Sequence, residues 1–139
     1  LGDVYKRQGW QERDRGEAHR LVHEFMENSG WVIDGNYTKF EYERRLAEAD
    51  KIIILALSRL VCFARAWRRY FHYRGTARAD MGEGCPERMD REFMWWILWK
   101  GRTRQKRGEL RSVAERYPIK TVVLKSQGEI DQYLEGILC

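Results

Sequence analysis

An aspartate that follows a short apolar segment is the first candidate for chemistry in this sequence. Asp34 ends the segment Trp31–Asp34, and a glycine and an asparagine follow it in a predicted turn. Open α/β sheets bind ligands outside the carboxyl ends of their strands. A carboxylate there can hold Mg²⁺ beside nucleotide phosphates, directly or through water. The same carboxylate can instead cap the turn through backbone groups, and its position alone leaves both roles open.

A group of arginines is the second candidate. Six arginines and no acidic residue occur between Arg59 and Ala79: Arg59, Arg65, Arg68, Arg69, Arg74 and Arg78. A guanidinium group binds phosphate through paired hydrogen bonds and can stabilise charge on a transferred phosphoryl group. On a helix, Arg65 and Arg69 share one face with His72, opposite the apolar stripe. We interpret the group as a phosphate-binding surface, although a solvated helix face is the simpler interpretation of any single arginine.

A second basic run follows three tryptophans. Trp95, Trp96 and Trp99 precede the basic residues Lys100, Arg102, Arg104, Lys106 and Arg107. Aromatic side chains beside basic ones can bind single-stranded nucleic acid by stacking, or can lie on a membrane surface. The i, i+4 spacing of Trp95 and Trp99 is equally typical of ordinary helix packing.

Other motifs give weaker signals. His19 and His23 have a spacing that can ligate a metal, but H-R-L-V-H lacks the glutamate of a zinc protease, and we expect no metal role. The cysteines form no C-x-x-C motif and are odd in number, which predicts a reduced, cytosolic chain. The sequence contains no G-x-x-x-x-G-K-[ST] phosphate-binding loop.

Length and composition predict one globular domain. The chain has 139 residues, of which 43% are hydrophobic, and its net charge of +5 fits an anionic partner. The longest apolar runs, Ile52–Leu57 and Phe93–Trp99, are too short to span a bilayer, so we expect no membrane partner. Leu1–Gln8 show no core periodicity, and we expect them to be a non-native or disordered lead-in.

Apolar periodicity predicts the elements that must position these residues. The first is a helix with a core face made of Ala18, Leu21, Val22, Phe25 and Met26. Strands are predicted at residues 31–34, 51–57 and 121–125, the second of them buried on both faces. Strands that alternate with helices indicate an α/β fold with a parallel sheet covered on both faces.

The remaining helices are predicted from caps and apolar stripes. Thr38 and Glu41 form a capping box for a helix to about Glu48, and Ser126 and Glu129 form another for the last helix. Helices are also predicted after Ser58 and over residues 87–100 and 104–116, with a mobile loop at residues 75–86. The core stripes are Leu60, Phe63, Ala64, Trp67, Tyr70 and Phe71 in the Ser58 helix, and Ile130, Tyr133, Leu134 and Ile137 in the last helix.

Several segments together resemble the bacterial DNA topology modulation proteins, which are small P-loop NTPases similar to adenylate and shikimate kinases. The resemblance runs from Gly9 to the C-terminus, and D-G-N-Y (34–37) and E-G-C-P-E (83–87) are its most specific parts. Further matching segments are Gly9-Trp10, Glu12–Asp14, Ala49-Asp50 and the arginine-rich stretch from Arg59 to Arg78.

The resemblance implies a three-layer α/β fold of the P-loop NTPase or nucleoside-kinase type, lacking its first strand and phosphate-binding loop. Residues 9–139 would form a partial domain with a lid at about residues 74–88. Asp34 would take the Walker-B-like place, bind Mg²⁺ through water and act in catalysis with Arg65 and Arg69. ATP would contact Arg59, Arg74 and Arg78.

The intact protein is then expected to bind ATP and Mg²⁺ and to transfer a phosphoryl group to a small molecule or to water. This chain would be an inactive fragment of it. The alternative is a basic nucleic-acid-binding module that affects DNA topology. One strand of the family usually ends in an aspartate followed by a proline, whereas Ala56 and Ser58 stand near those places. The family's absent first strand lies between the strands at Trp31 and Lys51, which predicts a cleft or a re-paired sheet there.

Overall fold

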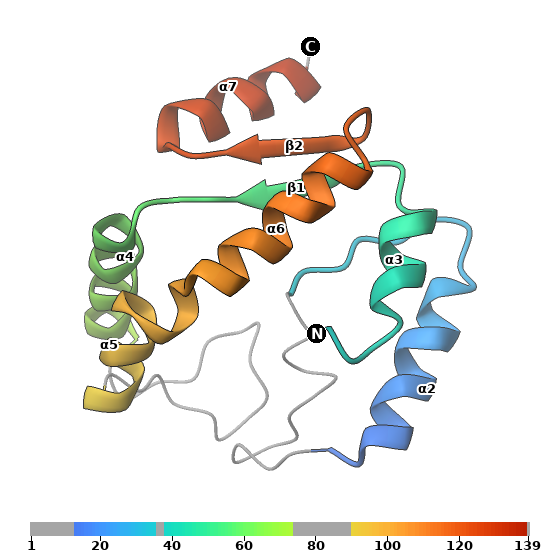
Figure 1. The fold of residues 1–139 in the computed structure, drawn as a ribbon, viewed down its shortest axis with the longest axis horizontal. Coiled ribbons are helices and arrows are strands. Elements are labelled where there is room, and N and C mark those ends of the chain that lie inside the picture. The colour runs from blue at the N-terminus through green and yellow to red at the C-terminus, as the bar shows by residue number, and fades with distance from the viewer. Residues whose placement is uncertain (1–12, 36–37, 74–89, 139) are drawn as a thin grey trace. The chain divides into compact units, whose positions relative to one another are not determined.

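The computed structural model describes residues 13–35, 38–73 and 90–138, and these contain six α-helices and two strands (Figure 1). The chain divides into two compact units. The first consists of residues 1–48 and 73–87, and the second of residues 49–72 and 88–139. The predicted lead-in, the predicted lid, Arg74 and Arg78 lie outside the described residues.

The first unit begins with α2 (Arg15–Met26), which confirms the first predicted helix. Asp14 caps it, since its side chain accepts a hydrogen bond from the Glu17 backbone N–H at 3.1 Å. The fully buried stripe is narrower than predicted: it consists of Ala18, Val22 and Met26. Phe25 was expected on the core face but is about half exposed, because the partners of this helix cover only a narrow stripe of it.

The segment after α2 corrects the predicted strand at residues 31–34. Trp31–Gly35 belongs to neither of the two described strands. Trp31 and Ile33 pack against the buried cluster of Ala18, Val22, Met26 and Phe40. Val32, between them, is 91% exposed. The segment therefore has the alternating burial of a strand without a ladder, because a strand needs a hydrogen-bonding neighbour as well as an apolar sequence.

The second helix of this unit, α3 (Tyr42–Glu48), starts later than its sequence predicts. The backbone of Glu41 has a φ of 49°, in the left-handed region that ends regular helical geometry. Glu41 therefore precedes the helix instead of occupying its third position, and the predicted capping box with Thr38 is wrong. Phe40, just before this residue, is buried and completes the cluster on α2.

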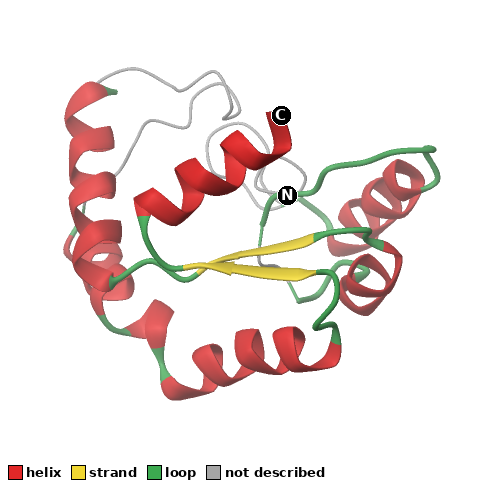
Figure 2. Cartoon of the chain, turned by 90° about the horizontal axis from the view of Figure 1, so that it is seen from above, coloured by secondary structure: helices red, strands yellow, loops and turns green. Residues whose placement is uncertain are grey.

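The second unit is built on two parallel strands, β1 (Ile52–Leu55) and β2 (Thr121–Leu124). Ile52 pairs with Thr121 and Leu55 with Leu124. These two predicted strands are confirmed, as is the α/β class. Helices α6 (Arg104–Arg116) and α7 (Gln127–Leu138) lie on opposite sides of this sheet (Figure 2).

Burial along β1 differs from the predicted fully buried strand. Ile54 is 7% exposed, but Ile53 is 49% and Leu55 57% exposed. The reason is that the helices cover β1 less: α6 and α7 contact β2 more extensively, and β1 has one strand neighbour among the described residues. A parallel sheet buries both faces only where helices cover both.

Helix α4 (Arg59–His72) follows β1, and α5 (Arg91–Leu98) and the 3₁₀ turn η2 (Lys100–Arg102) precede α6. The predicted bounds of α6 are confirmed at both ends.

The predicted core stripes of α4 and α7 are largely wrong, since Ala66 is the buried residue of α4. Five of the residues that were predicted to face the core are between 42% and 71% exposed: Leu60, Trp67, Phe71, Leu134 and Ile137. These helices contact few other elements, and much of their apolar surface meets solvent. Within the described part of the chain, no helix is long and apolar enough to cross a membrane.

Candidate functional site

The carboxyl ends of the two strands form the candidate site. Because β1 and β2 are parallel, both strands end at the same edge of the sheet. β1 continues through Ala56–Ser58 into α4, and β2 continues through Lys125 and Ser126 into α7. Both arrows in Figure 1 point towards the beginnings of these helices. Two helix N-termini therefore lie at the edge where open α/β sheets bind ligands.

Serine caps begin both helices. The Ser58 Oγ accepts a hydrogen bond from the Val61 N–H at 3.3 Å, and the Ser126 Oγ accepts one from the Glu129 N–H at 3.2 Å. The Glu129 carboxylate also accepts the Lys125 N–H at 2.7 Å. The first turn of α4 has no acidic residue. Its N-terminal N–H groups and positive dipole end favour an anion.

An arginine links the two helices at this edge. The Arg65 guanidinium donates a hydrogen bond to the side-chain oxygen of Gln127, the first residue of α7. The Gln127 amide group donates in turn to Asp131 at 2.6 Å. The Arg65 side chain is exposed, so its remaining N–H groups can reach an incoming anion. We call Ser58, Arg59, Arg65, Lys125 and Gln127 the strand-end site.

The structure places four of the predicted phosphate-binding arginines, Arg59, Arg65, Arg68 and Arg69, on α4. Arg59 is the first residue of the helix, while Arg65 and Arg69 lie one turn apart on one face. Arg59 and Arg65 are exposed, whereas Arg69 is partly buried and its Nε atom is fully so. The geometry makes Arg59 and Arg65 the accessible cations of the strand-end site.

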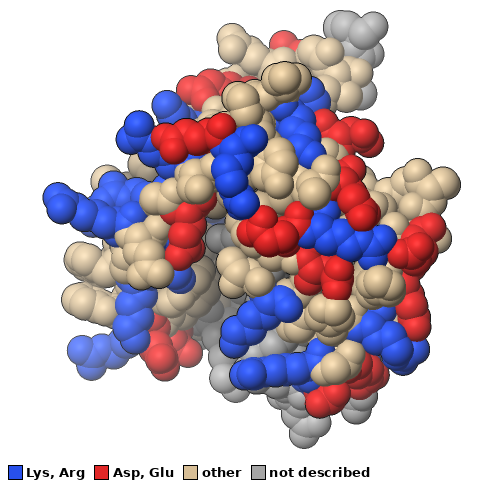
Figure 3. Space-filling model, turned by 45° about the vertical axis from the view of Figure 1, so that its right-hand side comes forward, with Lys and Arg blue, Asp and Glu red and all other residues tan. Residues whose placement is uncertain are grey.

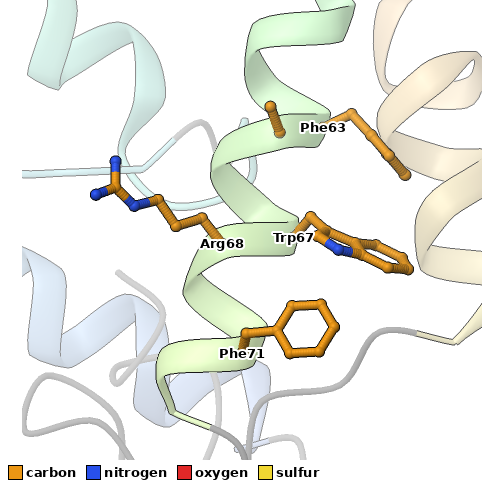
Figure 4. Close-up of a pocket in the computed structure, with 5 residues that line it drawn as sticks. Phe63, Trp67, Arg68 and Phe71 are labelled. Atoms are coloured by element: carbon orange, nitrogen blue, oxygen red, sulfur yellow. The ribbon is translucent and has the colours of Figure 1, made fainter.

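A different face of α4 carries an open hollow of about 570 Å³ (Figure 4). Phe63, Trp67 and Phe71 point to one side of the helix there, and Arg68 points to the other. The ring centroids of Phe63 and Phe71 lie 5.7 and 5.5 Å from that of Trp67. The hollow is aromatic and lacks the paired polar groups that orient a small ligand.

Asp34, the predicted magnesium ligand, belongs to the first unit. It is exposed and precedes Gly35, whose φ of 130° favours a residue without a Cβ atom. The Arg45 guanidinium lies 3.5 Å from the Gly35 carbonyl oxygen and donates to it. Arg45 is only 7% exposed, and this burial lowers its pKa. Sequence reasoning missed Arg45, because Arg44 and Arg45 are adjacent and the pattern does not say which one faces inward.

A polar cluster joins α2 to α3 beside this turn. The His19 Nε2 atom lies 2.7 Å from the Glu41 carboxylate, and Arg44 lies 2.7 Å from both Glu27 and Glu48. The hydrogen bond from Arg44 lowers the pKa of Glu27, and its acidic partners raise the pKa of Arg44. Residues 13–35, 38–73 and 90–138 contain no group of three or more His, Cys, Asp or Glu side chains able to hold a metal ion.

Three described arginines outside the strand-end site are paired within their own helix. Arg20 bonds to Glu24, Arg44 to Glu48 and Arg111 to Glu115, each pair at an i, i+4 spacing. Figure 3 accordingly shows a face on which basic and acidic side chains alternate. The net positive charge is therefore not spread evenly. Two segments without acidic residues, 59–79 and 93–108, carry more basic side chains than the rest of the chain can balance.

Comparison of this chain with protein-family models, with curated proteins and with solved structures gives no match.

Proposed function

We propose that this chain is part of a P-loop NTPase of the nucleoside-kinase type, which binds ATP with Mg²⁺ and transfers a phosphoryl group to a small molecule or to water. The observation that carries the proposal is the strand-end site. Two parallel strands lead into two helices, and Arg65 of the first helix is bonded to Gln127, the first residue of the second, with Lys125 just before that helix. Helices on opposite sides of the sheet agree with a three-layer arrangement.

The arginines of α4 would bind the anionic end of the nucleotide. Arg65 has a fixed position, because it is bonded to Gln127, and it still offers further donors to a phosphate oxygen. Arg59 and Lys125 add positive charge at the same edge. Such preplaced cations stabilise charge that develops on phosphoryl oxygens during transfer.

Asp34 would hold Mg²⁺ through a water molecule. Its exposed carboxylate has suitable donor chemistry, since Mg²⁺ in such sites takes one or two carboxylates and completes its shell with water and substrate phosphates. The ion would neutralise phosphate charge when bound. Arg69 would complete the basic surface around the phosphates, together with Arg74 and Arg78 of the predicted lid segment. The sequence contains no phosphate-binding loop, so we expect this chain alone to bind ATP without turning it over.

The test is the equilibrium binding of ATP to the 139-residue chain, measured by calorimetry at low ionic strength with and without Mg²⁺. Arg65→Gln removes a charge-assisted hydrogen bond and should weaken binding roughly tenfold. Arg111→Gln is the matched control, because it removes the same charge from an exposed helix position paired with Glu115, and it should change affinity by less than about twofold. Equal weakening by both variants, or no binding at millimolar ATP, would contradict the proposal.

A further inference from the structure

Three half-exposed tryptophans follow closely in the chain, two on α5 and the third at its C-cap. Trp95, Trp96 and Trp99 are 51%, 47% and 48% exposed. The rings of Trp95 and Trp99 are stacked, with centroids 4.4 Å apart and planes inclined by 23°. Each ring therefore keeps substantial surface in contact with solvent. Single exposed apolar residues are common on protein surfaces, but three exposed indoles close together indicate a binding surface.

Neighbouring elements fix the third indole in position. The ring of Phe93 is nearly parallel to that of Trp96, at an inclination of 6° and a centroid distance of 6.4 Å. A Cβ atom on Gly101 would lie 3.3 Å from the Trp96 ring, so η2 lies close against it. The Lys106 ammonium, from α6, lies 5.3 Å from the centre of the same ring. These contacts join α5, η2 and the first turn of α6 in one surface.

Basic residues dominate the segment of the chain that carries this surface, and Glu92 and Glu109 flank it. From Phe93 to Gly108 the sequence holds five basic residues and no acidic one. The side chains of Lys100, Arg104 and Arg107 are exposed. The first turn of α6 has no acidic residue either, and Thr103 caps its N-terminus by accepting the Lys106 N–H at 3.2 Å. Among the described residues, Lys100, Arg104 and Arg107 have no acidic partner and a positive helix end follows the indoles in the chain, whereas Arg20, Arg44 and Arg111 are paired with acidic partners.

We propose that this surface of Trp95, Trp96, Trp99, Lys100, Arg104, Lys106 and Arg107 binds single-stranded nucleic acid. Unpaired bases would stack on the exposed indole surface, and backbone phosphates would contact Lys100, Arg104 and Arg107. Aromatic platforms beside a basic track are the features that bind single strands without reading their sequence. A duplex hides its base faces, so the indoles favour the single-stranded form. This proposal does not depend on the strand-end site or on ATP.

The decisive comparison uses the wild-type chain and two fluorescent oligonucleotides of equal charge. One is an oligothymidylate of about 20 nucleotides, and the other is an abasic strand of the same length. Stacking contributes about 1–3 kcal/mol per base, so fluorescence anisotropy should show at least about fivefold tighter binding of the oligothymidylate. Equal affinities would show that charge alone acts and would overturn the proposal. So would binding to phosphatidylcholine–phosphatidylserine vesicles without binding to the oligothymidylate, since that result indicates a membrane surface instead.

Matched variants locate the binding surface. Trp99→Ala should weaken oligothymidylate binding at least about fivefold and leave the abasic strand unaffected. Trp67→Ala is the control, because Trp67 is 42% exposed on α4, outside the proposed surface, and it should have little effect. If Trp99→Ala leaves oligothymidylate binding unchanged, the proposal is wrong. Circular dichroism verifies that each variant is folded. If a variant does not fold, the comparison of the two oligonucleotides with the wild-type chain still tests the proposal.

A second pair of variants tests the phosphate contacts. Arg104→Gln with Arg107→Gln should reduce the magnitude of the slope of log affinity against log salt by about 1.4, at about 0.7 per single-strand phosphate contact. Arg20→Gln with Arg111→Gln removes the same charge from residues that are paired with Glu24 and Glu115. This control should leave the slope unchanged. Equal changes in both double variants would contradict the assignment of phosphate contacts to α6.

Discussion

The first unit buries one stripe of α2 completely, whereas the second unit leaves much of the apolar surface of β1 exposed. Ala18, Val22 and Met26 on α2 are at most 3% exposed, while Ile53 and Leu55 on β1 are about half exposed. The difference comes from what covers each element. Irregular segments supply Trp31, Ile33 and Phe40 to α2, but α6 and α7 contact β2 more extensively than β1.

From this contrast we assign stability to the buried cluster of the first unit and ligand binding to the exposed surface of the second. Complete burial gives the α2 cluster its stability, since each buried apolar side chain contributes about 1.5–3 kcal/mol. The second unit buries less, and its surface carries both features that we assign to ligands. These are the strand-end site with Arg65 and the tryptophans of α5 and its C-cap. Substitutions at matched buried and exposed positions can test this separation.

The largest effect is expected from Val22→Asp. Val22 is 2% exposed within the α2 cluster, and an unpaired charge there should cost about 3–5 kcal/mol of the free energy of unfolding. Val32→Asp is the control, since Val32 is 91% exposed in the same unit and should tolerate the charge within about 0.5 kcal/mol. The indole N–H resonance of Trp31, which packs on this cluster, can be followed in urea. Similar costs at the two positions would show that the cluster is not the core of this unit.

A smaller effect is expected from Ile54→Ala in β1. Ile54 is 7% exposed, and its truncation should cost roughly 2–4 kcal/mol. Ile53→Ala removes the same atoms from a half-exposed neighbour and should cost about 1 kcal/mol or less. Hydrogen exchange at the Ala56 amide, which bonds to the Leu124 carbonyl at 2.7 Å, reports on strand pairing. A larger loss of protection in Ile53→Ala than in Ile54→Ala would reverse the burial pattern of β1.

The smallest effect concerns the ionic link between α2 and α3. The hydrogen bond from Arg44 lowers the pKa of Glu27 below its ordinary value of 4.5. A carboxyl group with a lowered folded-state pKa stabilises the fold above its unfolded pKa and loses that contribution as the pH falls through the folded value. The link should therefore weaken in acid, below about pH 4.5.

Arg44→Gln should return the pKa of Glu27 towards its ordinary value, as a carbon-detected NMR titration can measure. Arg20→Gln serves as the control, because Arg20 bonds to Glu24 at 2.8 Å and not to Glu27. A Glu27 titration that is identical in wild type and Arg44→Gln would show that the 2.7 Å contact is absent in solution.

Local signals in the sequence predicted much of the fold. The bounds of α6 and the caps at Ser58 and Ser126 follow from residues within one or two helical turns. The two strands of the sheet follow from their β-branched apolar runs. These features need no information from distant parts of the chain.

The features that sequence reasoning missed depend on distant contacts. Trp31–Asp34 has the composition of a strand, but no described strand pairs with it. The start of α3 depends on Glu41, whose carboxylate contacts His19 across 22 positions of the chain. The bond from Arg65 to Gln127 spans 62 positions of the chain. It joins α4 to α7 at the strand-end site, whereas the sequence places the arginines on one helix only.

The most direct test of the strand-end site is an amide chemical-shift titration of the 139-residue chain with inorganic phosphate and then with ATP. We expect the largest shifts at the first-turn amides of α4 and α7, residues 59–61 and 127–129, and a loss of these shifts in Arg65→Gln. Shifts confined to other segments, or the same shifts in wild type and Arg65→Gln, would contradict the assignment of an anion to this edge of the sheet.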